Sequence, residues 1–190
     1  MSGNIEPTDR RVRRTRTAIV AAFNELLFAK GYDAISAGDV AERADVGRST
    51  FYQHYSGKDA VLAQSLFGLL KPIAQAGFDT SPDPMLTVVV EHMWSNRRLG
   101  RTLFASGARP VMNRLLRDLI AEALSAKMER DGSALPRSLL ATHLAHGHLA
   151  LLDEWMSGRH GCPASIMAES IHELAHASIH RVDATLDSGR

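Results

Sequence analysis

Residues 39–62, DVAERADVGRSTFYQHYSGKDAVL, decide the predicted fold of this chain. Ser36, just before this stretch, is a good N-cap for a short helix. Asp39 follows three residues later, as in a capping box. A tight turn then leads to a second short helix over residues 48–54. Two short helices joined by such a turn are the helix-turn-helix pattern.

The first half of the second helix carries polar side chains. In helix-turn-helix proteins the second helix lies in the major groove and presents its amino-terminal residues to the bases, while the first helix crosses the backbone. Here those residues are Arg48, Ser49 and Thr50, and Phe51 is expected to point to the core and anchor the helix. The pattern therefore predicts a DNA-binding head.

Helical periodicity continues on both sides of this motif. Ile19 and Phe23 share one face of a first helix that ends near Lys30 and Gly31, and a fourth helix follows residue 57. An arginine cluster precedes the helix-turn-helix and favours attraction to phosphates. It consists of Arg10, Arg11, Arg13, Arg14 and Arg16.

The remainder of the chain shows helix after helix and no period-two strand. Further helices are expected over residues 85–95, 97–106, 110–130, 136–157 and 163–182. We therefore expect an all-α fold of about nine helices, in which a three-helix head precedes a larger helical body. The expected division is a disordered tail at 1–9, the helix-turn-helix domain at 10–60, and an effector-binding and dimerisation domain at 61–190.

Composition excludes several classes of protein. Hydrophobic residues make up 45% and charged residues 23% of the 190, as in an ordinary globular protein. The first residues lack a signal-peptide pattern, and no apolar run is long enough for a membrane span. The lone Cys162 excludes an internal disulfide and fits a reducing compartment, so we expect a cytoplasmic protein with no membrane partner.

The segment from Arg16 to Leu62 resembles the amino-terminal domain of the tetracycline-repressor (TetR) family of bacterial regulators. The resemblance is carried by the short helix, the turn and the run TFYQHY at 50–55, which leads to Lys58. Many unrelated helix-turn-helix proteins lack both the tyrosine and the lysine at these positions. The resemblance implies phosphate contacts from Ser36, Tyr52, His54 and Lys58, and base or phosphate contacts from Arg48, Ser49 and Thr50.

Two positions depart from the family pattern. Asp45 stands where the family often has glycine, so a left-handed turn residue would be slightly strained. Gly47 replaces the usual serine or threonine at the cap of the recognition helix, which removes one hydroxyl that could contact a phosphate.

Residues 143–177, HLAHGHLALLDEWMSGRHGCPASIMAESIHELAHA, resemble the family more loosely. A helix with a tryptophan, a short glycine loop and a helix begun by proline form the family's dimer contact, and two such helices from each subunit could pack as a four-helix bundle. The alternative is that the apolar faces of these helices pack against the chain's own core, and it holds for some of their residues. The predicted interface residues are Leu144, Gly147, Leu151, Ile166, Ser170, Leu174 and Ala177.

A sensing pocket is expected among the helices between residues 85 and 157, although such side chains often serve only as core. Met and aromatic residues with a few histidines suggest an apolar or amphiphilic effector. The candidate lining residues are Val89, His92, Met93, Phe104, Met112, Leu116, His143 and Trp155.

Histidines recur every four residues at His172, His176 and His180 and so share one helix face. This spacing could hold zinc or nickel, but helix faces that meet solvent or a partner subunit also carry histidines, and no cysteine joins the group. We expect no metal site and no cofactor.

The favoured interpretation is a homodimeric transcriptional repressor that a small-molecule effector releases from a palindromic double-stranded DNA operator. An effector-independent DNA-binding protein controlled by a partner protein is the alternative, and it predicts a body without a cavity. An enzyme is not expected, because the sequence has no nucleophile–base constellation, no glycine-rich phosphate loop and no paired-carboxylate motif.

Overall fold

The computed structural model describes residues 7–127 and 135–184, and within these ranges the chain forms nine α-helices and no strand. Each described helix end from residue 84 onward lies within two residues of its expected position; the expected end at 130 falls outside the described residues. The helices are α1 (Pro7–Lys30), α2 (Ala37–Arg43), α3 (Arg48–His54), α4 (Lys58–Ala74), α5 (Pro84–Ser95), α6 (Arg97–Phe104), α7 (Arg109–Lys127), α8 (Arg137–Met156) and α9 (Ala164–Ala184).

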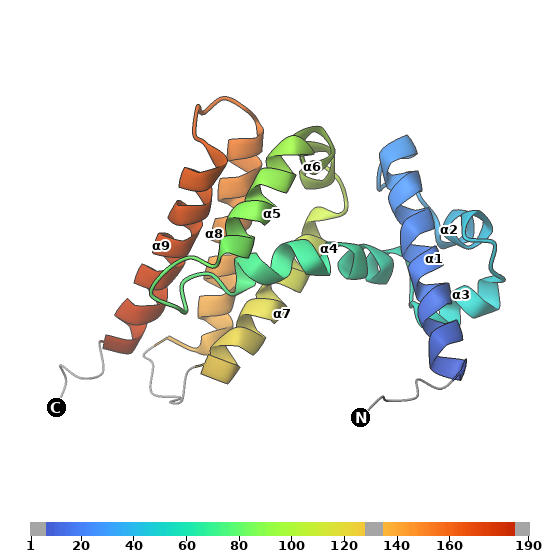
Figure 1. The fold of residues 1–190 in the computed structure, drawn as a ribbon, viewed down its shortest axis with the longest axis horizontal. Helices are drawn as coiled ribbons and strands as arrows, with labels where there is room; N and C mark the ends of the chain where they lie inside the picture. The colour runs from blue at the N-terminus through green and yellow to red at the C-terminus, as the bar shows by residue number, and fades with distance from the viewer. Residues whose placement is uncertain (1–6, 128–134, 185–190) are drawn as a thin grey trace.

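The first three helices form a head at one end of the molecule, and α5 to α9 form the larger body at the other (Figure 1). Helix α4 runs from the head into the body, so the expected boundary at residues 60 and 61 falls inside this helix. Of the tail expected at 1–9, residues 1–6 lie outside the described part of the chain, and α1 begins at Pro7.

Buried apolar residues at helical spacing hold the head together. The buried set comprises Ile19, Phe23, Val40, Phe51 and Leu62, and it brings α1 to α4 around one core. Asp45 has a φ of 53° in the turn between α2 and α3, the left-handed conformation that glycine adopts more easily. Gly47 is the N-cap of α3 and provides no side-chain hydrogen bond, as its sequence implied.

Helix α7 packs against α4 and α8, while α5 packs against α9. The Trp94 and Trp155 rings lie 4.7 Å apart between centroids, and the Trp155 indole donates a hydrogen bond of 2.8 Å to the Cys162 carbonyl. This bond ties the loop after α8 to the core. Burial, with a smaller contribution from His143, lowers the pKa of His148 to about 4, so this core histidine is neutral at pH 7.

The connection between α4 and α5 approaches α9 very closely at Gly77. This residue has a φ of 83°, and its N–H donates a hydrogen bond of 3.3 Å to Nδ1 of His172. A Cβ atom at this position would lie 2.6 Å from the carbonyl carbon and the Cβ of Ala175. Only glycine lets the connection lie against α9 in this way.

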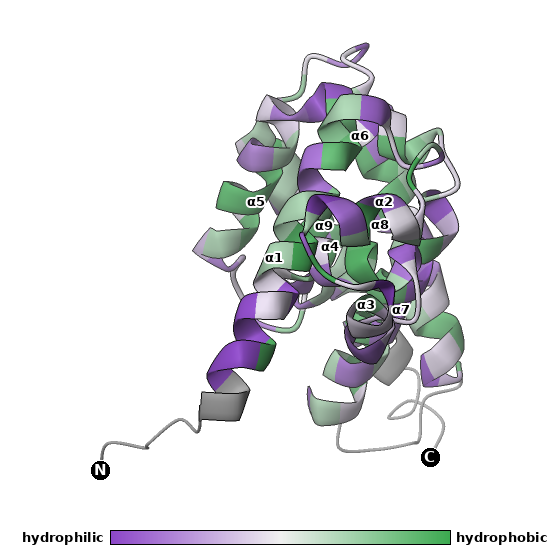
Figure 2. Cartoon of the chain, turned by 90° about the vertical axis from the view of Figure 1, so that its right-hand side faces the viewer, coloured by the Kyte–Doolittle hydropathy of each residue, from purple (hydrophilic) through white to green (hydrophobic). Residues whose placement is uncertain are grey.

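Hydrophilic residues dominate the amino-terminal turns of α1, where the arginine cluster lies (Figure 2). Among the helices that the structure describes, none combines the length and the apolar character needed to cross a bilayer.

Candidate DNA-binding surface and ligand cavity

Helix α3 is anchored on one side and exposed on the other. Phe51 and Tyr55 are buried in the head, and the Tyr52 ring meets the Phe51 ring edge-on at 5.3 Å between centroids. Tyr52 itself is 59% exposed. The expected inward direction of Phe51 is therefore confirmed, and the helix presents its polar side outward.

Five of the seven predicted DNA contacts lie on this one short helix. Arg48, Ser49 and Tyr52 are exposed, and Thr50 and His54 are half-buried. The Arg48 guanidinium lies over the start of α2, because a Cβ placed on Gly38 would be 3.3 Å from its Nη2 atom. A base or phosphate in front of α3 would thus meet a cation, a hydroxyl and a phenol together.

Ser36 holds the start of α2 through the predicted capping box. Its hydroxyl accepts the Asp39 N–H at 3.1 Å, and Asp39 Oδ2 accepts the Ser36 N–H at 2.8 Å. Lys30 binds the same carboxylate oxygen at 2.8 Å, and this bond, with those from Ser36, lowers the pKa of Asp39 to about 2. The Ser36 hydroxyl acts as an acceptor here, so its proton is available to donate to a phosphate.

The Lys58 side chain contacts the protein itself, and its phosphate contact stays a prediction. Its ammonium donates a hydrogen bond of 3.0 Å to the Tyr32 carbonyl and lies 4.4 Å from the centre of the Tyr32 ring. The Tyr32 hydroxyl in turn donates to Asp59, and burial is the largest of the effects that raise the pKa of Tyr32. These contacts tie the turn between α1 and α2 to the first turn of α4.

The arginine cluster lies along the exposed first turns of α1. Arg16 differs from the rest, because its guanidinium lies 5.5 Å from the centre of the Tyr55 ring and donates a hydrogen bond of 3.3 Å to Gln64. Arg16 thereby joins α1 to α3 and α4, while Arg10, Arg11, Arg13 and Arg14 extend from the head as exposed cations.

The body contains an apolar cavity of about 380 Å³ that reaches the head. Four of the eight candidate pocket residues line it, namely His92, Met93, Phe104 and Met112. The other four candidates do not: Val89, Leu116 and Trp155 are packed into the core, and His143 is exposed on α8.

Helical spacing could not separate the cavity from the core, because both are lined by the same kinds of side chain. The remaining lining comes from α1, α4, α6, α8 and the residue between α5 and α6, and these segments are far apart in the sequence and share no local pattern. These additional residues are Asn24, Leu27, Phe28, Ser65, Leu66, Leu69, Leu70, Asn96, Leu99, Gly100, Leu103 and Met156.

The predicted interface residues divide between an outer face and the core. Gly147 on α8 and Ile166, Leu174 and Ala177 on α9 are exposed, and Leu151 and Ser170 are half-buried. Leu144 is buried in its own chain, so for this residue the alternative, a position in the core, holds.

The histidines of α9 are not all on a surface. His172 is buried, where it accepts the Gly77 N–H, and its ring stacks 6.0 Å from that of His176. Among the described residues, no group of three or more His, Cys, Asp or Glu side chains could hold a metal ion.

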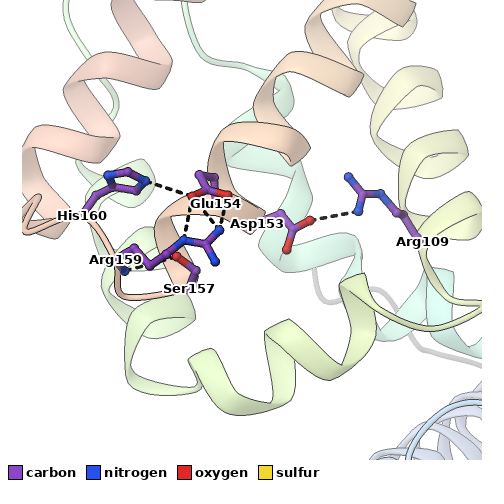
Figure 3. A network of polar contacts seen from close by, with 6 residues as sticks. All are labelled: Arg109, Asp153, Glu154, Ser157, Arg159 and His160. Atoms are coloured by element: carbon purple, nitrogen blue, oxygen red, sulfur yellow. Dashed lines mark hydrogen bonds and ion pairs between the residues drawn. The ribbon is translucent and has the colours of Figure 1, made fainter.

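Polar contacts hold the end of α8 in place (Figure 3). Asp153 pairs with Arg109 of α7 at 2.9 Å, and Glu154 pairs with Arg159 at 2.8 Å and with His160 at 2.9 Å. Hydrogen bonds from Arg159, and then from His160, lower the pKa of Glu154. The exposed pairs of Glu154 orient the loop between α8 and α9, and their free-energy contribution is small.

The sequence of the head is similar to that of known regulatory proteins. The family model described as "Bacterial regulatory proteins, tetR family" matches residues 19–64. The regulator YdeS of Bacillus subtilis is 43% identical over 51 residues, which are 27% of this chain and 26% of YdeS. The regulator EthR of Mycolicibacterium smegmatis is 38% identical over 68 residues, which are 36% of this chain and 31% of EthR. The chain thus spans less than a third of the length of the curated relatives it matches.

Solved structures extend the likeness to the body. The transcriptional repressor FadR of Thermus thermophilus is similar in fold with a TM-score of 0.50 and 22% identity. The match covers 86% of this chain and 94% of FadR. Head and body together therefore follow one known arrangement of helices.

Proposed function

Since this chain belongs to the TetR family of bacterial transcriptional regulators, we propose that it is a repressor released from a palindromic operator by a small-molecule effector. The observation that carries this proposal is helix α3, anchored by Phe51 and Tyr55 and exposing Arg48, Ser49 and Tyr52. Such a helix enters the major groove, and the exposed arginines of α1 add attraction to the phosphates.

A homodimer gives this head its specificity. Gly147 and Ala150 on α8 and Ile166, Leu174 and Ala177 on α9 are exposed small or apolar residues on outward faces. Paired with the same faces of a second copy, they would form a four-helix bundle. Two heads then read half-sites about 34–36 Å apart on the DNA.

The effector part of the proposal rests on the cavity. A body that responded only to a partner protein would need no internal space, whereas this cavity of about 380 Å³ is of the size that binds small molecules. FadR, with the same fold, was solved in complex with lauroyl-CoA. Helix α4 links the cavity to the head. Its residues Leu66, Leu69 and Leu70 line the cavity, and Lys58 at its start donates a hydrogen bond to the Tyr32 carbonyl in the head.

The test is fluorescence-anisotropy binding to the DNA upstream of the protein's own gene, against random competitor DNA, over a salt series. We expect tight binding that resists competitor DNA. The logarithm of the association constant should fall by about 0.9 per neutralised phosphate for each tenfold rise in salt concentration. Equally weak binding to both DNAs would count against an operator at this position.

The dimer is tested by replacing Leu174 with glutamate. Leu174 is 56% exposed in the single chain, so the change leaves the fold intact but places a carboxylate in the proposed interface. We expect the dimer dissociation constant to rise at least about tenfold, as measured by sedimentation velocity. Val88→Glu is the matched control, because Val88 is 55% exposed on α5, outside the proposed face. Equal effects of both changes would contradict the assignment of the interface.

A further inference from the structure

Two hollows meet where the head joins the body. The apolar cavity of about 380 Å³ and a wider surface groove of about 630 Å³ share four lining residues, Leu27, Phe28, Asn96 and Leu99. Leu27 and Phe28 belong to α1 of the head, and Leu99 belongs to α6 of the body. The groove is therefore the vestibule of the cavity, and we call the two together the junction site.

The inner part of the junction site suits an apolar chain. Phe104, Met112 and Met156 line its end in the body. Gly100 lets Met156 approach closely at this end, because a Cβ there would lie 2.8 Å from the Met156 sulfur and force that side chain to move. Methionine side chains adapt readily to ligands of different shape.

The vestibule suits an anion. Arg97 and Arg98 both line it, and no aspartate or glutamate lines the vestibule or the cavity. The Arg97 guanidinium lies 4.7 Å from the centre of the Trp94 ring and donates a hydrogen bond of 3.3 Å to the Trp94 carbonyl, which holds it in place. Within residues 7–127 and 135–184, neither arginine forms an ion pair.

We propose that the junction site binds an anionic amphiphile, with its apolar chain in the cavity and its carboxylate facing Arg97 and Arg98. The chain would enter past Phe28, which is 66% exposed at the mouth. A carboxylate in the vestibule would meet two arginines and the first turn of α6, and cations and a helix start both favour negative charge.

Such a ligand would contact the DNA-binding head directly. Asn24, Leu27 and Phe28 lie on α1, so the ligand touches the helix that carries the head as well as α6 of the body. The head also contacts the body through Asp33, which accepts the Gly107 N–H at 3.0 Å. Binding therefore sets the position of α1 relative to α6. This regulatory consequence rests on the proposed function, whereas the binding itself does not.

The experiment compares sodium decanoate with 1-decanol by isothermal titration of the full chain. We expect decanoate to bind about tenfold more tightly than decanol, because only the carboxylate pairs with the two arginines. In the Arg97→Gln/Arg98→Gln variant this preference should disappear while decanol binding remains. The control is Arg101→Gln/Arg114→Gln, which removes two exposed arginines that line neither hollow and should keep the preference.

The location is tested with two further variants. Leu99→Trp should block the passage between vestibule and cavity and abolish binding of both ligands. Phe28→Ala, an exposed change that leaves folding intact, should weaken both ligands several-fold because it removes apolar contact at the mouth. Equal affinity of the unchanged protein for decanoate and decanol, or an undiminished preference for decanoate in the Arg97→Gln/Arg98→Gln variant, would overturn the proposal.

Addition of decanoate to the operator complex separates this proposal from the proposed function. We expect DNA affinity to fall at least about fivefold, a typical coupling between two sites. Decanoate binding without any change in DNA affinity would support the junction site and overturn its regulatory role. Tight operator binding with no binding of either ligand would overturn the junction site and leave the regulator intact.

Discussion

Replacement of Gly77 by alanine is expected to lower the free energy of unfolding by about 3–5 kcal/mol, the largest single-residue effect we predict. The φ of 83° costs an alanine about 1–2 kcal/mol. In addition, the new methyl group would lie 2.6 Å from the carbonyl carbon and the Cβ of Ala175, and closer still to the His176 nitrogen. These are atoms of the α9 backbone and its first side-chain carbon, so α9 itself must move.

Gly158→Ala is the matched control for this prediction. Gly158 has a similar φ of 76°, but a Cβ placed there meets nothing within 4 Å. The control isolates the cost of the left-handed backbone and should lose only about 1–2 kcal/mol. Urea unfolding followed by circular dichroism measures both variants. Equal losses would mean that the connection before α5 does not lie against α9 as described.

The double change Arg48→Ala/Tyr52→Ala is expected to weaken operator binding about a hundredfold, or about 3 kcal/mol. Both side chains are exposed on α3, so the head should remain folded without them. The proposed roles are a base or phosphate contact for Arg48 and a phosphate contact for Tyr52. Fluorescence anisotropy against random competitor DNA measures the loss.

Arg101→Gln serves as the control for this DNA-binding test. It removes an exposed arginine of α6 in the body and should leave operator affinity nearly unchanged. Each single variant also gives a salt slope, because loss of a phosphate contact reduces that slope by about 1 while loss of a base contact relaxes specificity instead. Normal operator affinity in the double variant would contradict the assignment of α3 as the recognition helix.

The helices and the head were predictable because their signals are local. A buried face at 3.6-residue spacing, the capping box at Ser36 and Asp39, and the break before Lys58 all depend on residues within a few turns of one another. The inward direction of Phe51 followed from the same spacing. For this reason the helix ends and the helix-turn-helix follow from the sequence without any tertiary contact.

The direction of individual polar and apolar side chains was less predictable. The position of Lys58 at the start of α4 suggested a phosphate contact, and only the structure shows that its ammonium also contacts the carbonyl and ring of Tyr32, in the turn between α1 and α2. Leu144 occurs in the same stretch as the outward-facing Gly147, yet it is buried. In both cases the partner comes from elsewhere in the chain, so no local pattern contains it.

The sequence alone determined the all-α architecture, the helix-turn-helix and the family of the head, because periodicity, caps and turn residues act over short distances. Only the tertiary structure decided which apolar side chains fill the core and which surround a cavity. That distinction depends on how α1, α4, α5, α6, α7 and α8 approach one another. Phe28 in the head and Arg97 and Leu99 in the body line one groove in this way, although they are about seventy positions apart in the sequence.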